Sequence, residues 1–170
     1  MTTFSAVDLL QDLPQEATKF FAVFSRFEFA MKRAGYLKSH AEGAAAEPGW
    51  DCFARDLTNT FFQTVQNSNS AKVLFDVPPK KQIVQGNSFD WKKGEDITDI
   101  NKLFLAVRCV RNNLFHGGKF LIEPVEEPSR NKELLRACPA ILETALQECK
   151  TSGVEKPKLK ELHRHFFEPL

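Results

Sequence analysis

The residues with the clearest chemical potential lie together in the segment 111–118, which reads Arg-Asn-Asn-Leu-Phe-His-Gly-Gly. Arg111 and His116 stand five positions apart, at the end of a segment with helical periodicity. A neutral histidine can accept a proton from a ribose 2′-hydroxyl. An arginine can bind the adjoining phosphate and stabilise the charge that develops on it. These two residue types are therefore suited to cutting RNA without a metal ion.

The helical angle between these residues predicts which of them share a face. At about 100° per residue, Arg111 and His116 are separated by a net angle of about 140°, whereas Asn112 lies about 40° from His116. Arg108 precedes the arginine and the asparagine by about one turn. We therefore expect a polar stripe of Arg108, Asn112 and His116. Arg111 lies at its edge, toward the apolar side, where a guanidinium needs an anionic partner.

The same residues also have purely structural interpretations. A histidine in the last helical turn commonly complements the helix dipole, and an arginine on a helix is commonly a solvated charge. Gly117 and Gly118 would end the helix, because glycine adopts the left-handed cap conformation without a penalty. The spacing is compatible with a catalytic site and with an ordinary helix end. The choice between these two interpretations therefore depends on the rest of the sequence.

Composition indicates the class of protein. The chain has 170 residues, of which 42% are hydrophobic and 26% charged, which favours one domain with a full core. Its 16 phenylalanines indicate thick packing between helices. No run is apolar for the length of a membrane span, and residues 1–11 do not resemble a signal peptide. We expect a single domain over 1–170, located in the cytoplasm and without membrane contact.

Charge and cysteine spacing exclude several kinds of site. A net charge of +1 argues against nucleic-acid binding through overall charge, so any RNA contact has to come from a local patch. The basic candidates are Arg108, Arg111, Lys119, the pair Lys80 and Lys81, and the segment 156–165. Cys52, Cys109, Cys138 and Cys149 show no zinc-ligand spacing, and no His-Glu-x-x-His motif is present. We expect reduced thiols, no metal site and no cofactor.

Hydrophobic periodicity predicts four main helices. They cover 14–34, 50–66, a third segment from a cap at Asp96 or Thr98 to residue 115, and 129–150, where Ser129 is the expected cap. Pro139 should kink or split the fourth helix. Residues 67–98 do not show a helical pattern and should form a short hairpin or an irregular flap. Residues 119–128 should be extended or looped, and 159–167 should form a short terminal helix.

Together these elements predict an all-α antiparallel helix bundle with a long connection between its second and third helices. Its core should span about 14–150, followed by a tail at 151–170. In the first helix, Glu28 lies beside the apolar stripe. It has two interpretations: a partner for Lys32 at i+4, or a partner for an arginine of the motif.

A four-helix bundle with Arg-Asn-x-x-x-His near the end of its third helix resembles the HEPN superfamily, whose ribonucleases carry an Arg-x(4–6)-His motif. The segment 24–32, which reads Phe-Ser-Arg-Phe-Glu-Phe-Ala-Met-Lys, also looks like the first helix of a branch found on plasmids and mobile elements. The resemblance covers about 14–150. It rests on Arg111, Asn112 and His116, the double glycine and the order of the helices.

The resemblance implies a metal-independent endoribonuclease that acts as a homodimer, with the two motifs facing each other across the interface. It would leave 2′,3′-cyclic phosphate ends on its RNA substrate. Arg111 would bind the phosphate, His116 would act as acid or base, and Asn112 would orient the phosphate or the histidine. Arg108, Asn113 and Lys119 are the expected RNA-binding neighbours, with Glu28 in support. Such proteins often serve as toxins or in phage defence, and any antitoxin would be a separate chain.

Two other functions remain open from the sequence. A HEPN-like module without catalysis would use the same cleft to bind RNA, a nucleotide or a partner protein. A structural or regulatory protein would instead use the long connection 67–98 as its contact surface, and changes at Arg111 and His116 would then have no functional effect. The presence of arginine, polar residue and histidine together favours catalysis.

Overall fold

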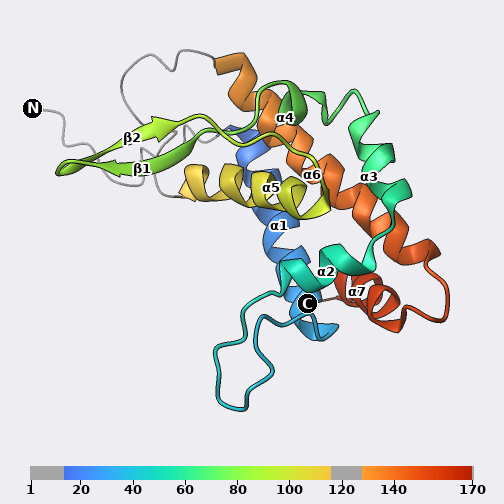
Figure 1. Cartoon of the computed structure of the whole chain (residues 1–170). Helices are drawn as coiled ribbons and strands as arrows, with labels where there is room; N and C mark the ends of the chain where they lie inside the picture. The colour runs from blue at the N-terminus through green and yellow to red at the C-terminus, as the bar shows by residue number, and fades with distance from the viewer. Residues whose placement is uncertain (1–13, 116–127, 170) are drawn as a thin grey trace, which may run out of the picture.

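The computed structural model describes residues 14–115 and 128–169. The described chain is largely helical, with one small sheet, which confirms the expected α class (Figure 1). The elements are α1 (Gln15–Arg33), α2 (Trp50–Asp56), α3 (Asn59–Gln66), α4 (Lys72–Asp76), β1 (Lys81–Gln85), β2 (Ser88–Lys92), α5 (Ile100–Phe115), α6 (Pro128–Thr151) and α7 (Pro157–Phe167). None of the described helices is long and apolar enough to cross a membrane.

Aromatic rings from α1, α2, α3 and α5 form the centre of the core. Phe27 stacks on Trp50, with ring centres 5.7 Å apart and planes at 7°. Phe104 of α5 contacts Trp50 at 5.3 Å and Phe61 of α3 at 6.0 Å. The high phenylalanine content therefore serves helix packing, as predicted. This cluster fixes α5 against α1, and so sets the position of the motif at the end of α5.

The predicted second helix is interrupted, and the prediction of one helix over 50–66 is wrong at this point. Leu57 is extended, with ψ at 153°, and α3 starts again after Thr58. The Thr58 hydroxyl accepts a hydrogen bond from the amide of Phe61 at 3.3 Å, which caps the new helix.

The connection 67–98 contains the predicted hairpin but also a helix that was not expected. β1 and β2 pair antiparallel around a turn at Gly86 and Asn87, whereas Val73-Leu74-Phe75 belongs to the short helix α4. Leu74 is fully buried. Burial of α4 against α6 explains why this short apolar run is helical, because tertiary packing overrides a weak local preference.

Two predicted helix caps need correction, and one of the two predicted effects of Pro139 is not found. Asp99 caps α5 in place of Asp96 or Thr98, because its Oδ1 accepts from the amide of Lys102 at 2.9 Å. Ser129 lies inside the first turn of α6, which begins one residue earlier. Pro139 does not split α6, which runs as a single helix and contacts α1, α3, α4, α5 and α7.

The terminal helix is confirmed as α7, but it is not a solvated tail. α7 packs on α1 and α6 and buries Leu159, Leu162 and His165. The imidazole of His165 lies 2.8 Å from a Glu168 carboxylate oxygen. The packed body therefore extends beyond the predicted limit at residue 150. Of the segment 119–128 that was predicted to be extended or looped, 119–127 lies outside the described residues, and Pro128 is the first residue of α6.

A buried tyrosine behind the turn that ends α1 makes stability sensitive to alkaline pH. Tyr36 donates a hydrogen bond to Asp56 Oδ2 at 2.7 Å, and burial followed by this bond raises the pKa of Tyr36 well above its usual range. Below about pH 10 the phenol is neutral in both states, so its contribution is complete. Above that pH only the unfolded phenol ionises, so stability should fall by up to about 1.4 kcal/mol per pH unit.

Urea unfolding of wild type and Tyr36→Phe between neutral and strongly alkaline pH checks this expectation. The wild type should lose more stability than the variant, because phenylalanine has no proton to release. The buried thiols of Cys138 and Cys149, whose pKa values burial also raises, contribute equally to both proteins. Parallel pH profiles would contradict the role given to Tyr36.

Candidate nucleic-acid interface at the end of α5

The C-terminal half of α5 borders a cleft of about 540 Å³ that contains several of the predicted site residues. Arg108, Arg111 and Asn112 line it from α5, while Glu28 lines it from α1. The segment 47–55 supplies most of the other lining residues. The helical angle therefore predicted correctly that Arg108 and Asn112 share a surface, with Arg111 beside them.

Arg111 is held by four contacts at the floor of this cleft. Its Nη2 lies 3.4 Å from Glu28 Oε2, and its Nη1 donates to Asn112 Oδ1 at 2.9 Å. The guanidinium carbon also lies 5.1 Å from the ring centre of Phe24 and 5.6 Å from that of Phe115. The arginine side chain is 34% exposed, so it is positioned by its neighbours and still reaches solvent.

The partner of Glu28 was one of the two interpretations left open by the sequence. The structure pairs Glu28 with Arg111, the motif arginine, across 83 positions of sequence. The other carboxylate oxygen accepts from the Trp50 indole at 3.1 Å. Trp50 is therefore a site residue that sequence reasoning missed, because a tryptophan at a helix start shows only as an apolar residue. A carboxylate held from two sides fixes the guanidinium more strongly than a single solvated pair would.

Positive charge slightly exceeds negative charge in the cleft. Four basic and three acidic side chains line it, namely Lys38, Arg55, Arg108 and Arg111 against Glu28, Glu47 and Asp51. One basic and one acidic residue pair with each other at the rim, where Lys38 Nζ lies 2.9 Å from Glu47 Oε2. An anionic ligand would thus meet an excess of arginines next to α5.

The remaining predicted site residues are not in the cleft. Asn113 is only 6% exposed, and its side-chain amide donates to the backbone carbonyl of Lys80 at 2.7 Å. It therefore joins α5 to the hairpin, and the prediction that it contacts RNA is not compatible with this position. His116, the two glycines and Lys119 lie outside the described residues.

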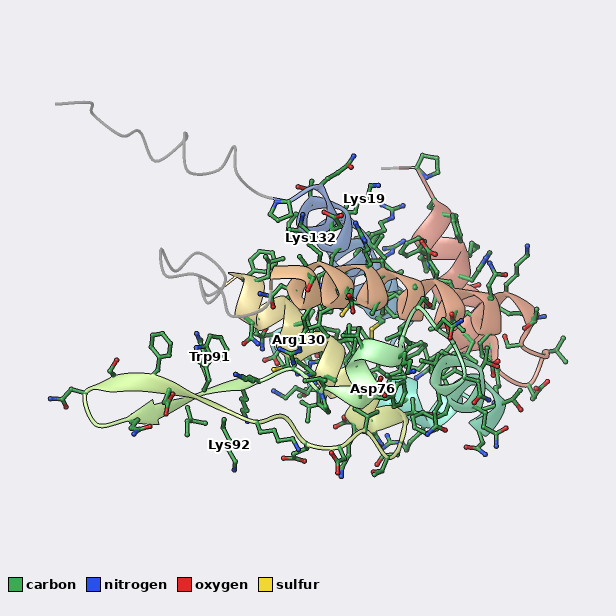
Figure 2. The ribbon with its side chains drawn as sticks, turned by 90° about the horizontal axis from the view of Figure 1, so that it is seen from above. Lys19, Asp76, Trp91, Lys92, Arg130 and Lys132 are labelled. Carbon is green, nitrogen blue, oxygen red and sulfur yellow. The ribbon has the colours of Figure 1, made fainter. Side chains whose placement is uncertain are left out.

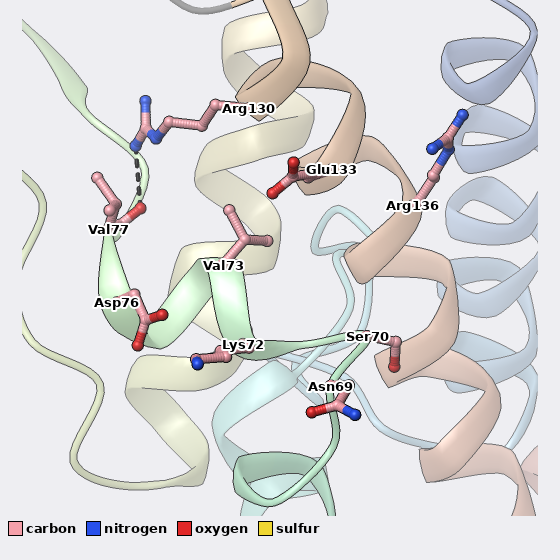
Figure 3. Close-up of a pocket in the computed structure, with 9 residues that line it drawn as sticks. All are labelled: Asn69, Ser70, Lys72, Val73, Asp76, Val77, Arg130, Glu133 and Arg136. Carbon is pink, nitrogen blue, oxygen red and sulfur yellow. Dashed lines mark hydrogen bonds between the residues drawn. The ribbon is translucent and has the colours of Figure 1, made fainter.

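A second hollow, of about 610 Å³, lies between α4 and α6 (Figure 3). Arg130 on its edge donates to the carbonyls of Val77 and Pro78 at 2.9 and 3.1 Å. This arginine thus fastens the start of α6 to the segment after α4. No residue predicted to act on RNA lines this hollow, so we take the α5 cleft as the candidate site although it is the smaller one.

Residues 14–115 and 128–169 contain no group of three or more histidine, cysteine, aspartate or glutamate side chains that could hold a metal ion. Cys52 and Cys109 are partly exposed and Cys138 and Cys149 buried, and all four are free thiols. No protein-family model, curated protein or solved structure matches the chain.

Proposed function

We propose that the protein is a metal-independent endoribonuclease of the HEPN type. The observation that carries this proposal is the gathering of Arg108, Arg111 and Asn112 in one cleft at the C-terminal end of α5. His116 follows α5 directly in the sequence. Arginine, amide and histidine at one helix end are the groups that RNA transesterification needs.

In the proposed reaction, His116 removes the proton from a ribose 2′-hydroxyl. The 2′-oxygen forms a bond to the neighbouring phosphorus, and the bond from phosphorus to the 5′-oxygen of the next nucleotide breaks. A protonated histidine returns a proton to this leaving oxygen. Arg111 stabilises the charge on the phosphate during this exchange, and Asn112 orients it. The products are a 2′,3′-cyclic phosphate and a 5′-hydroxyl.

The proposal includes a homodimer with the motif at the interface. Exposed apolar side chains beside the motif support it, since Phe21 of α1 and Phe115 of α5 are 48% and 51% exposed. Their ring centres lie 5.2 Å apart, and Phe115 also contacts Arg111. Paired exposed aromatic rings of this kind are common at protein interfaces. A second copy seated here would bring a second arginine next to the first.

The arrangement of helices supports the proposed HEPN bundle. α1, the α2–α3 pair, α5 and α6 correspond in order to the four helices expected of it, and the hairpin lies in the long connection before α5. We further propose that the protein acts in the cytoplasm as a toxin or defence effector, with RNA as substrate and a separate antitoxin chain as regulator.

The contacts of Arg111 favour one alternative. Because this arginine already pairs with Glu28 and Asn112, it contributes to the packing of α5 on α1. A non-catalytic module that binds RNA, a nucleotide or a partner protein in the same cleft would have the same contacts. Such a module would bind RNA without forming product.

Incubation of total cellular RNA with the purified protein in excess EDTA separates these two functions. We expect discrete cleavage products with the same yield as in magnesium, because histidine and arginine supply the acid–base and electrostatic groups. Treatment of the products with acid and phosphatase identifies cyclic phosphate ends. Intact RNA in both buffers, with folded protein, would favour the binding module. Cleavage only with magnesium would contradict the proposed chemistry.

A further inference from the structure

The β1–β2 hairpin is an exposed arm that extends past the C-terminal end of α5 (Figures 1 and 2). Along it, Val84 is 86% exposed and Phe89 48% exposed. A two-stranded hairpin with exposed apolar side chains is marginally stable in water, and burying those side chains against a ligand would stabilise it.

The strand register sorts the side chains onto two faces. Val84 pairs with Phe89 and Gln82 pairs with Trp91, so these four residues share one face. The ring centres of Phe89 and Trp91 lie 6.2 Å apart with their planes at 87°, so the two rings contact each other edge to face. Ile83 and Lys92 lie on the other face, and Figure 2 shows Trp91 and Lys92 pointing to opposite sides of the ribbon.

Positive charge gathers at the base of the hairpin, where Lys81 and Lys92 pair on the face opposite the aromatic rings. Lys80, Lys81, Lys92 and Lys93 stand where the two strands meet the body of the protein, and all four are exposed. Among the described residues none of them takes part in an ion pair. Aromatic rings for bases beside lysines for phosphates are the combination that binds single-stranded nucleic acid.

The hairpin is attached to the helix that carries the motif. The carbonyl of Lys80 accepts from Asn113 Nδ2 at 2.7 Å and lies 3.4 Å from Cys109 Sγ. Asn113 is next to Asn112, which lines the cleft. A strand of RNA held along the hairpin would therefore be led toward the end of α5.

We propose that the β1–β2 hairpin binds single-stranded RNA, with bases stacked on Phe89 and Trp91 and phosphates held by the lysines at its base. This inference rests on the proposed ribonuclease function, and it identifies unpaired RNA as the substrate class.

Binding is measured with a fluorescein-labelled, single-stranded oligouridine whose riboses are 2′-O-methylated, because this probe cannot be cut at the 2′-position. Trp91→Ala should weaken binding about 5- to 150-fold, the range for one lost stacking contact. Ile83→Ala removes an apolar side chain from the opposite face and should leave affinity nearly unchanged. Equal affinities for wild type and Trp91→Ala would overturn the proposal.

Tryptophan fluorescence gives a readout that does not depend on the hairpin unfolding. Trp50 is buried at 4% exposure but also lines the cleft, so the part of the quenching that is lost in Trp91→Phe is what reports on Trp91. Wild type should be quenched, whereas Trp91→Phe should bind with similar affinity and show markedly less quenching. Binding without any quenching in the wild type would place RNA elsewhere.

The lysines are tested through salt dependence. The double variant Lys80→Ala/Lys93→Ala, which keeps the two lysines of the opposite face, should lower the slope of log affinity against log salt by about 1.4, since each single-strand phosphate contact contributes about 0.7. Lys160→Ala on α7, an exposed lysine on another helix, should leave the slope unchanged. An unchanged slope in the double variant would refute the phosphate contacts.

Failure of this inference is distinguishable from failure of the ribonuclease proposal. If His116→Ala cuts RNA at the wild-type rate, the catalytic proposal fails while the binding result stands. If Trp91→Ala retains RNA affinity but changes the sedimentation coefficient, the hairpin is a protein contact and the inference is overturned. Duplex RNA should compete weakly, because its bases are not free to stack, and strong competition would also count against it.

Discussion

His116→Ala should cleave RNA about 10²- to 10⁴-fold more slowly than wild type, because the reaction loses its positioned acid–base group. The loss should appear in kcat, since the proposed histidine acts on the reacting oxygens and contributes little to RNA binding. Single-turnover cleavage of a defined oligonucleotide measures it directly. Affinity for the 2′-O-methylated probe should remain within about threefold of wild type.

The matched control is His40→Ala, which changes an exposed histidine outside the cleft and should leave the rate of RNA cleavage unchanged. Arg111→Lys adds a second test, because it keeps the positive charge but loses the planar fork that binds phosphate and contacts Glu28. A loss of less than about threefold in His116→Ala, with the fold intact by circular dichroism, would exclude this histidine from catalysis.

Phe27→Ala should give the largest loss of stability outside the motif. The Phe27 ring is fully buried and contacts Trp50, Phe53 and Phe166. Removal of such a ring costs about 3–5 kcal/mol, because the cavity cannot close completely. For a protein of this size the corresponding fall in Tm is about 6–20 °C. Differential scanning calorimetry measures this change.

Phe29→Ala is the control for this prediction, since Phe29 lies on the same helix and is 43% exposed. Its effect should stay within about 0.5 kcal/mol. Comparable losses for the two variants would mean that the aromatic cluster does not form the core. Because Phe27 stacks on the tryptophan that holds Glu28, its removal should also loosen Arg111.

The sequence predicted well those helices that bury one face in the core. α1 follows from the phenylalanine spacing at 20, 24 and 27, and all three rings are buried. Arg108 and Asn112 were placed together by helical angle alone. The break before α3 was not predicted, because Leu57 keeps the apolar spacing and is buried in spite of its extended backbone.

Features that depend on tertiary contacts could not be predicted from the amino-acid sequence. Trp50 supports Glu28 only because α2 folds back against α1. Asn113 has the same residue type as Asn112, and its inward direction depends on where the hairpin crosses α5. The short helix α4, which reads Lys-Val-Leu-Phe-Asp, is too short to show a helical repeat, and its helicity follows from burial against α6.

The two adjacent asparagines, Asn112 and Asn113, have different contacts, so a mutational scan of the motif would affect the protein in two different ways. Asn113→Ala would remove the shorter of two described side-chain contacts between α5 and the Lys80 carbonyl, and so loosen the attachment of the hairpin to α5. Asn112→Ala would leave that tether in place and free Arg111 on one side. Under the proposed function, both variants should lose activity in a phenotypic screen, Asn113→Ala through a loosened hairpin and Asn112→Ala through a displaced Arg111. Protease sensitivity at the hairpin would tell the two defects apart.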